Sequence, residues 1–417
     1  MDKLELLAPA GDLEKLKIAI IYGADAVYFG GQAFSLRAGA GGLAIHEMEE
    51  GLNFAHERGK KCYLTLNIYA HNEDIEPLYE YLASIKHLPI DGILVSDPGI
   101  MMMIREVLPD AEIHLSTQAN LTNAKTAEFW RRMGMKRLVL ARELSLTEIK
   151  GIRDALPEDV ELEAFIHGAM CISYSGRCLL SNFMTGRDSN RGACAHPCRY
   201  KYVLEEEKRP GEFYPVEEDS RGTYIMNSKD LCMIEHIPEL IKAGIASAKI
   251  EGRMKSIYYI AAVVQAYRRA IDAYYDNPDT WEFRQEWLDD LQKASHREFT
   301  TGFYFEYPED AQNYKTSAYV KDYSFTGLVL SYNNENRMAL VEQRNKMVIG
   351  DEVEFFGPDG KCFTQTIGEM RDYETGECID SAPHPQQKIY IGVNEPVSEC
   401  YMIRKKLEKD EEDLNVI

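Results

Sequence analysis

Short apolar runs alternate with amphipathic stretches along about two thirds of the chain, a pattern that predicts strands each followed by a helix. The runs expected to form strands are residues 4–8, 26–29, 62–67, 92–96, 112–116, 137–141, 161–166 and 247–250. Asp12 and Pro98 stand where helices are expected to begin, because Asp caps a helix and Pro is tolerated in its first turn. Eight strand–helix units in about 270 residues predict a closed (β/α)₈ barrel, a TIM-like α/β fold.

An open, doubly wound sheet shows the same alternation, so the turn after the first strand decides between the two folds. That turn reads Ala8-Pro-Ala-Gly11 and lacks the glycine-rich phosphate-binding fingerprint, which favours the barrel. The rhythm breaks after the seventh strand, where residues 169–222 form a long insertion that holds four cysteines. Because insertions after barrel strands lie on the face that carries active sites, we expect this one to contribute to function.

The sequence changes character near residue 320, where short β-branched and aromatic runs are separated by Asn, Gly, Asp and Pro turns. This pattern predicts a small all-β barrel. We therefore expect a TIM-like barrel domain at 1–320, a β-domain at 321–405 and a charged tail at 406–417. The runs expected to form strands of the β-domain are 326–330, 338–341, 352–356 and 387–391.

Composition and charge narrow the class of protein. The 417 residues are 45% hydrophobic, enough for a substantial core, and carry a formal net charge of −21. Such a charge repels polyanions and argues against a protein that coats nucleic acid, although a local basic patch can still dock one RNA. No apolar run reaches the length of a membrane-spanning helix, and MDKLELLAPAGD has no signal-peptide pattern, so we expect a cytoplasmic protein.

Four cysteines within the insertion give the strongest chemical signal. Cys171, Cys178, Cys194 and Cys198 follow the spacing C-x₆-C, C-x₁₅-C and C-x₃-C. Four thiolates suit either tetrahedral zinc or an iron–sulfur cluster. Structural zinc sites usually pair short C-x₂₋₄-C motifs, and only the last pair has that spacing here, which favours the cluster. Packing of the thiols as small hydrophobic groups is the alternative, and Cys232 is a further candidate ligand.

Basic residues accompany these cysteines, in contrast to the acidic chain as a whole. Residues 171–202 contain one acidic residue, Asp188, and the five bases Arg177, Arg187, Arg191, Arg199 and Lys201. The bases predict an anion pocket or an RNA contact beside the metal site. A solvated loop surface and compensation for the charge of the thiolates are the alternative explanations.

Polar residues that follow the predicted strands complete the candidate site, because the carboxyl ends of barrel strands meet at one mouth. We expect His167 and Glu251 to act as acid–base groups, and Arg142 and Arg253 to clamp an anionic substrate. No GxSxG or HExxH motif is present, so neither of those hydrolytic mechanisms is indicated. The other residues expected to contact substrate are Arg37, Asn67, Gln118, Arg187 and Arg191, with Asn120 also at the mouth.

The segment Glu163–Ser181, which contains Cys171 and Cys178, resembles the signature of the collagenase-like peptidase family of unknown catalytic type. Further blocks of similarity follow in the family's order, and the resemblance spans about residues 1–320. The terminal β-domain resembles that of the longer bacterial members, and the chain is most similar to the prephenate-dependent tRNA uridine hydroxylases. The other matching blocks are 7–11, 23–28, 227–232, 249–256 and 301–304.

The resemblance implies an oxygen-independent hydroxylase that forms 5-hydroxyuridine at the tRNA wobble position. It implies a 4Fe–4S cluster held by Cys171, Cys178, Cys194 and Cys198, with prephenate as cosubstrate and oxygen donor. The partners would then be tRNA and a small dicarboxylate, with no membrane. Two alternatives stay open: a collagenase-like peptidase that acts on peptides, and a zinc-stapled RNA-binding or scaffold protein without catalysis.

Overall fold

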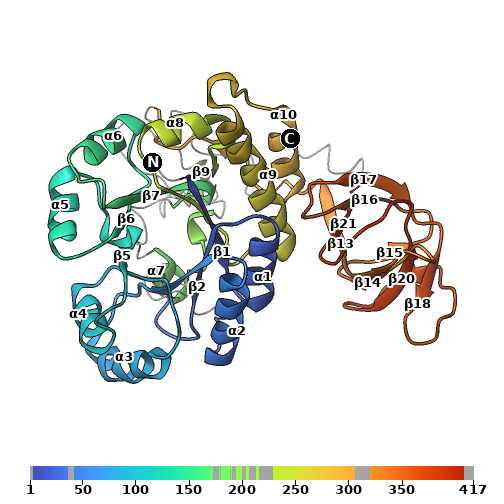
Figure 1. The fold of residues 1–417 in the computed structure, drawn as a ribbon, viewed down its shortest axis with the longest axis horizontal. Coiled ribbons are helices and arrows are strands. Elements are labelled where there is room, and N and C mark those ends of the chain that lie inside the picture. Colours follow the sequence, from blue (N-terminus) through green and yellow to red (C-terminus); the bar gives the residue numbers. More distant parts are fainter. Residues whose placement is uncertain are drawn as a thin grey trace.

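The computed structural model describes residues 3–35, 42–171, 178, 180–187, 189, 194–199, 203–205, 213–215, 229–305 and 320–407. Two substructures are visible in Figure 1, a ring of helices around parallel strands and, beside it, a domain built of strands. Within the described part of the chain, no helix is both long and apolar enough to cross a membrane.

Eight parallel strands close into a barrel, which confirms the predicted fold. Each strand pairs with the next, and the last one, β11, pairs with both β7 and β1. The barrel strands are β1 (Glu5–Ala10), β2 (Ala26–Gly30), β3 (Lys61–Leu66), β4 (Gly92–Val95), β5 (Ile113–Leu115), β6 (Arg137–Val139), β7 (Glu161–Ala169) and β11 (Ser247–Ile250).

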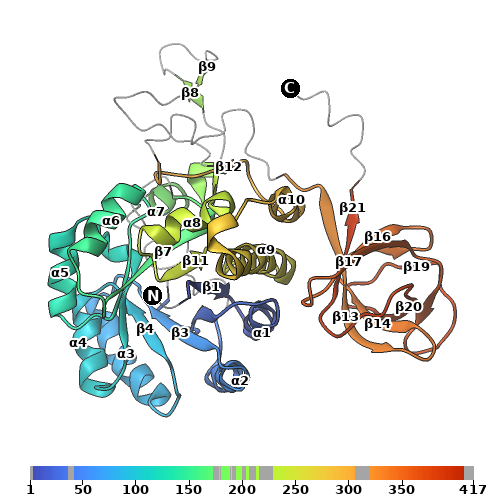
Figure 2. The ribbon, with the colours of Figure 1, turned by 45° about the horizontal axis from the view of Figure 1, so that its top comes forward.

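Helices surround the barrel and cover its apolar outer face (Figure 2). Asp12 accepts a hydrogen bond from the backbone N–H of Lys15 at 2.8 Å, and Pro98 opens its helix behind the N-cap Asp97, as predicted. The helices are α1 (Leu13–Ile21), α2 (Ile45–His56), α3 (Asn72–Ile85), α4 (Pro98–Val107), α5 (Ala124–Arg132), α6 (Leu146–Asp154), α8 (Ile237–Lys242), α9 (Ile257–Asp276) and α10 (Gln285–Lys293).

Additional elements lie in the connection from β7 to β11 and after α10. Strand β10 (Asp230–Cys232) runs antiparallel to the end of β7, and β12 (Phe299–Thr300) pairs with β10, so both extend the sheet outside the barrel. The sequence pattern did not predict these two strands. The insertion itself contains α7 (Leu180–Thr185), the 3₁₀ turn η3 (Pro197–Arg199), β8 (Val203–Glu205) and β9 (Phe213–Pro215).

A register shift between β7 and β11 decides which way the side chains at the end of β7 point. Lys249 pairs with Phe165, but Ile250 pairs with His167, so Ile166 is an additional residue on β7. Such a bulge reverses the alternation of inward and outward side chains beyond it. Phe165 therefore faces the barrel interior, whereas His167 faces the surrounding helices.

The C-terminal domain is all-β, as predicted, and contains a seven-stranded antiparallel sheet in the order β17-β16-β21-β13-β14-β20-β18. Val329, Phe355 and Ile389 belong to its own buried core. The strands are β13 (Tyr323–Asn333), β14 (Met338–Gln343), β15 (Met347–Val348), β16 (Glu352–Phe356), β17 (Cys362–Thr366), β18 (Met370–Asp372), β19 (Ser381–Ala382), β20 (Lys388–Gly392) and β21 (Met402–Lys406).

This domain packs against α1, α9 and α10 of the barrel domain, as Figure 1 shows. The hydroxyl of Tyr22 donates to the carbonyl of Cys400 at 2.7 Å, and the ring of Tyr258 stacks on Phe325 with centroids 5.6 Å apart. Arg404 pairs with Glu354 of its own domain and with Asp290 of α10 at 3.5 Å. Apolar and charged contacts together therefore fix the β-domain on the side of the barrel.

Candidate functional site

A cavity of about 200 Å³ lies at the carboxyl end of the barrel strands, between the barrel and the insertion. The fold brings most of the predicted site residues to this one place. Barrel residues that follow β3, β5, β6 and β11 form one wall, and residues of the insertion form the other. The predicted residues that line the cavity are Asn67, Gln118, Arg142, Glu251 and Arg253, with Cys171, Cys178, Cys194 and Cys198.

Two cysteines of the insertion accept hydrogen bonds from nearby backbone N–H groups. The Cys178 sulfur accepts from the backbone N–H of Leu180, and the Cys194 sulfur accepts from the N–H of His196, each at 3.4 Å. His196 adopts a left-handed backbone with φ 56°, an uncommon conformation for a residue other than glycine. Ser181 accepts from the N–H of Ala195 at 2.9 Å, which links the two cysteine segments.

The donor chemistry of this wall fits an iron–sulfur cluster. All nine cysteines lie in the described part of the chain and form no disulfide there, and four of them surround one cavity. N–H donors to sulfur are among the features that tune such clusters. Across the described residues, no three His, Cys, Asp or Glu side chains converge closely enough to hold a single ion. A cluster in which each thiolate binds its own iron places its ligands further apart than a single ion does.

The cavity lining is strongly cationic, in contrast to the acidic chain. Four cations, Arg142, Lys249, Arg253 and Lys255, face one carboxylate, Glu251. Opposite charge at a partly desolvated site favours an anion, and thiolates or a carboxylate substrate would each satisfy it.

Arg142 is positioned by three contacts, and part of its guanidinium has no partner among the residues that the structure describes. It donates to the carbonyl of Ala169 at 3.1 Å, pairs with Glu251 at 3.3 Å and lies over the ring of Phe165, 4.0 Å from the centroid. Its Nε is buried without a hydrogen-bond partner among the described residues, as is Oε1 of Gln118. Buried polar atoms are usually paired, so a polar ligand or water in the cavity would satisfy these two atoms.

Arg253 enters the cavity from the loop after β11 and is buried. Its guanidinium donates to the hydroxyls of Ser35 at 2.5 Å and Thr65 at 3.3 Å. A Cβ on Gly30 would lie 2.3 Å from Nη2 of Arg253, so only glycine leaves room for the arginine there. The end of β2 thus accommodates a cation at the cavity wall.

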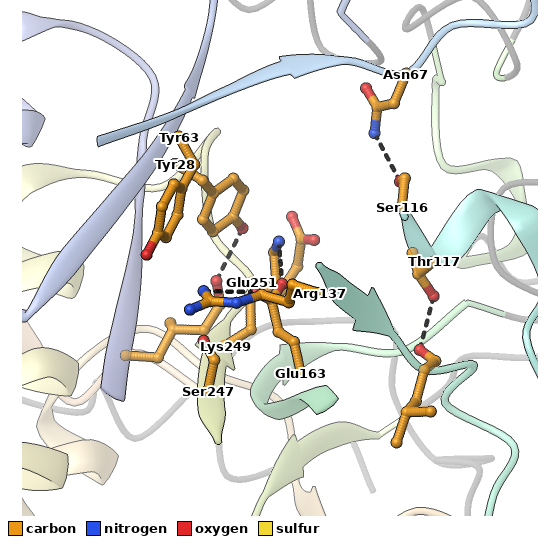
Figure 3. Close-up of polar contacts among 12 residues, drawn as sticks. Tyr28, Tyr63, Asn67, Ser116, Thr117, Arg137, Glu163, Ser247, Lys249 and Glu251 are labelled. Atoms are coloured by element: carbon orange, nitrogen blue, oxygen red, sulfur yellow. Dashed lines mark hydrogen bonds and ion pairs between the residues drawn. The ribbon is translucent and has the colours of Figure 1, made fainter. Parts of the chain in front are cut away.

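Lys249 of the cavity lining belongs to a cluster of buried charges, in which it lies beside Glu163 and Arg137 (Figure 3). Lys249 pairs with Glu163 at 2.6 Å, and Arg137 pairs with Glu163 at 3.3 Å and with Glu5 at 2.5 Å. Burial lowers the pKa of the Lys249 amine, and Glu163 only partly offsets this. Burial alone would raise the pKa of Glu163, but Lys249 and Arg137 more than compensate and lower it.

Sequence reasoning did not single out Lys249 or Glu163 as site residues, although both are charged residues within buried strands. A charged residue within such a strand is the signal that could have found them, because it must have a buried partner.

Elsewhere at the same barrel mouth, directly after β3, the Asn67 amide donates to the Ser116 hydroxyl at 3.2 Å (Figure 3).

Other predicted residues lie away from the cavity. His167 is 2% exposed, its ring lies among Tyr259, Tyr267 and Phe299, and it is not part of the cavity lining. Burial, with smaller contributions from Lys255 and His296, lowers the pKa of His167 to about 3. His167 therefore does not lie where it could contact a substrate in the cavity, as the acid–base role predicted for it requires.

The remaining predicted residues also differ in their positions. Cys232 is buried beside Tyr267, whose hydroxyl lies 3.8 Å from its sulfur, whereas Cys198 lines the cavity. Cys198 is thus the better placed of these two candidate ligands. Arg187 is exposed and does not line the cavity. The predicted residues outside the described part of the chain are Arg37 and Arg191.

Both domains of the chain are similar to known proteins. The family model described as "Peptidase family U32" matches residues 11–314, and "Peptidase family U32 C-terminal domain" matches residues 321–404. "tRNA hydroxylation protein P1" of Bacillus subtilis is 46% identical over 97% of this chain and 95% of its own. "tRNA hydroxylation protein P" of Escherichia coli is 37% identical over 97% and 96%. A Porphyromonas gingivalis protein named "Collagenase" is 32% identical over 95% and 96%.

Proposed function

The chain belongs to peptidase family U32, and on that premise we propose that it is an RNA hydroxylase whose active site is the cysteine-lined cavity. The reaction we propose is oxygen-independent formation of 5-hydroxyuridine at the tRNA wobble position, with a 4Fe–4S cluster and with prephenate as cosubstrate. The observation that carries the proposal is that four thiols and four cations line one cavity at the mouth of the barrel. With tRNA as the substrate, the proposal also includes a cytoplasmic location.

The relatives support the RNA-hydroxylation part of the proposal. Two of them are named for tRNA hydroxylation and match nearly the full length of both chains, so both domains are shared. The wobble base lies in a single-stranded loop, where an enzyme can take it out of its stack. Because the whole chain is acidic, we expect tRNA binding to be weak and sensitive to salt.

The cluster would be held by Cys171, Cys178, Cys194 and Cys198. Such a cluster would supply electron transfer at the cavity. The chain's own contribution is to hold the thiols in place through the N–H groups of residues 180 and 196 and to offset their charge with the cationic lining.

The barrel side of the cavity would bind the cosubstrate and the uracil. Arg142 and Arg253 suit the two carboxylates of prephenate, and the amides of Asn67 and Gln118 suit the edge of a base. Glu251, which pairs with Arg142 and is the carboxylate of the cavity lining, would take the proton from uracil C5. In the net reaction C5–H becomes C5–OH, a two-electron oxidation, while the donor loses its hydroxyl oxygen and is reduced by two electrons.

Anaerobic purification with iron, sulfide and zinc analysis tests the cofactor. We expect about four irons per chain and broad visible absorption in the wild type, and loss of both in Cys171→Ser or Cys194→Ser. Cys378→Ser is the matched control, because it removes an exposed thiol of the β-domain. Zinc at one equivalent per chain would instead support the scaffold alternative.

The loaded protein is then incubated anaerobically with unmodified tRNA and prephenate, and nucleosides are analysed by mass spectrometry. We expect 5-hydroxyuridine that depends on prephenate and on Arg142. A loaded protein that leaves tRNA unchanged under these conditions would overturn the proposal.

A second candidate function is peptide hydrolysis, favoured by the relative named "Collagenase". Metal-free protein that cleaves gelatin, and loses that activity through Glu251→Gln, would establish it. Activity that persists in Glu251→Gln would point to a contaminating protease.

A further inference from the structure

Lys249 places a primary amine at the floor of the cavity. It lies on β11 with its Nζ 2.6 Å from the Glu163 carboxylate and 4.2 Å from the centroid of the Tyr28 ring. Its side chain is 4% exposed, yet it is part of the cavity lining. A small molecule in the cavity therefore meets an amine that bulk water barely reaches.

An ion pair that serves only the fold is the simpler explanation of Lys249 and Glu163. Such buried pairs can often be replaced by apolar residues without loss of stability. Glu163 also has a second cation, Arg137, at 3.3 Å, which is itself not part of the cavity lining. The feature that an ion pair alone does not explain is that Lys249, rather than Glu163 or Arg137, is part of the cavity lining.

A carboxylate-binding group lies near the amine. The Arg142 guanidinium and the Lys249 amine both lie against the Phe165 ring, at 4.0 and 5.6 Å from its centroid. Arg142 retains a buried Nε without a partner among the described residues. A 2-oxo acid carries its carbonyl carbon directly beside its carboxylate, so it can present one group to each cation.

We propose that Lys249 forms a protonated imine with the carbonyl carbon of a 2-oxo acid bound through Arg142. The inference rests on the proposed function, because the cosubstrate named there carries a 2-oxo acid side chain. The imine would fix that cosubstrate at the cavity floor, opposite the cysteines.

The chemistry balances without an oxidant. The ammonium and the carbonyl give an iminium and one water: a C=N bond forms, the C=O bond breaks and the oxygen leaves as water. Attack requires the neutral amine, and the Glu163 carboxylate at 2.6 Å can hold the proton until it is returned to the departing oxygen. The iminium carries the same charge as the ammonium, so its pair with Glu163 persists. The Tyr28 and Phe165 rings limit the access of water that would hydrolyse it.

Reductive trapping tests the proposal on the full chain. The protein is incubated with pyruvate or prephenate and cyanoborohydride, digested and mapped by mass spectrometry. We expect one reduced adduct at Lys249, absent in Lys249→Arg, with exposed Lys150 as the internal measure of random labelling. Labelling of Lys249 no greater than that of Lys150 would overturn the inference, and this result needs only the wild type.

Hydroxylation of tRNA by the same preparations separates the inference from the proposed function. We expect Lys249→Arg and Lys249→Met to slow hydroxylation about 100-fold or more, the scale on which the loss of a catalytic group acts. Full activity in either folded variant would overturn the imine and leave the hydroxylase intact. An adduct at Lys249 in a protein that never hydroxylates tRNA would support the imine and overturn the proposed hydroxylase function.

Discussion

Replacement of Glu163 by Gln should strongly destabilise the barrel, because it removes the carboxylate paired with the buried Lys249, whereas Arg137 keeps Glu5 and Glu161. Glu163 is fully buried and lies 2.6 Å from Lys249 and 3.3 Å from Arg137. Removal of one partner of a buried ion pair typically costs about 3–5 kcal/mol. Lys249 can instead lose its proton. At pH 7 this costs about 4.6 kcal/mol for a lysine of ordinary pKa, which lies within the range typical of a broken buried pair.

The reverse change should be milder. Lys249→Met leaves Glu163 with Arg137 as a partner, so we expect it to cost clearly less than Glu163→Gln. The double variant should be more stable than the sum of the two single effects predicts, by about 1 kcal/mol or more. This asymmetry follows from the geometry of the three side chains and not from burial alone.

Urea unfolding followed by tryptophan fluorescence measures these changes. The three tryptophans, Trp130, Trp281 and Trp287, all belong to the barrel domain, so the signal reports that domain. Glu128→Gln is the matched control, because it makes the same chemical change in a surface cluster with two arginines and should leave the midpoint unchanged. A Glu163→Gln midpoint equal to that of Lys249→Met would refute the reasoning.

Three further predictions concern the site and its surroundings. Burial lowers the pKa of His167 to about 3, below the value of about 6.5 in an unfolded chain, so the unfolded state binds the proton first as pH falls. The free energy of unfolding should therefore fall by about 1 kcal/mol between pH 7 and 5.5 because of His167. Urea titrations at the two pH values should show a smaller fall for His167→Gln. Gly30→Ala should displace Arg253 and weaken binding of the anionic cosubstrate, measured as a raised KM, whereas Gly151→Ala, with open space around it, should not. Arg142→Lys keeps the charge but loses the planar fork, so KM should rise about tenfold, equivalent to 1.4 kcal/mol, and an unchanged KM would remove Arg142 from the binding site.

The barrel could be predicted from the sequence because its strands are buried on both faces and therefore appear as continuous apolar runs. The fold then implied the site: carboxyl ends of parallel strands share one mouth, so Asn67, Gln118 and Arg142 were expected together although they are distant in sequence. The same reasoning placed the cysteines of the insertion over that mouth, and the cavity lining agrees.

His167 shows why the rest could not be predicted. Alternation along β7 from Glu163 and Phe165 would turn His167 inward, but the additional residue Ile166 reverses it. Whether a bulge forms depends on the register of a strand about 80 residues away, which local sequence does not contain. Lys249 was missed for a related reason, since its role depends on a pair with Glu163 across two strands.

The central claim is that the cysteines of this cavity support tRNA hydroxylation, and the nucleoside content of tRNA in living cells tests it most directly. A strain that lacks the gene is complemented with wild type, Cys194→Ser or Cys378→Ser, and 5-hydroxyuridine is quantified by mass spectrometry. The account predicts that wild type and Cys378→Ser restore the modified nucleoside and that Cys194→Ser, expressed at the same level, does not. Equal restoration by all three, or 5-hydroxyuridine that never depended on the gene, would contradict it.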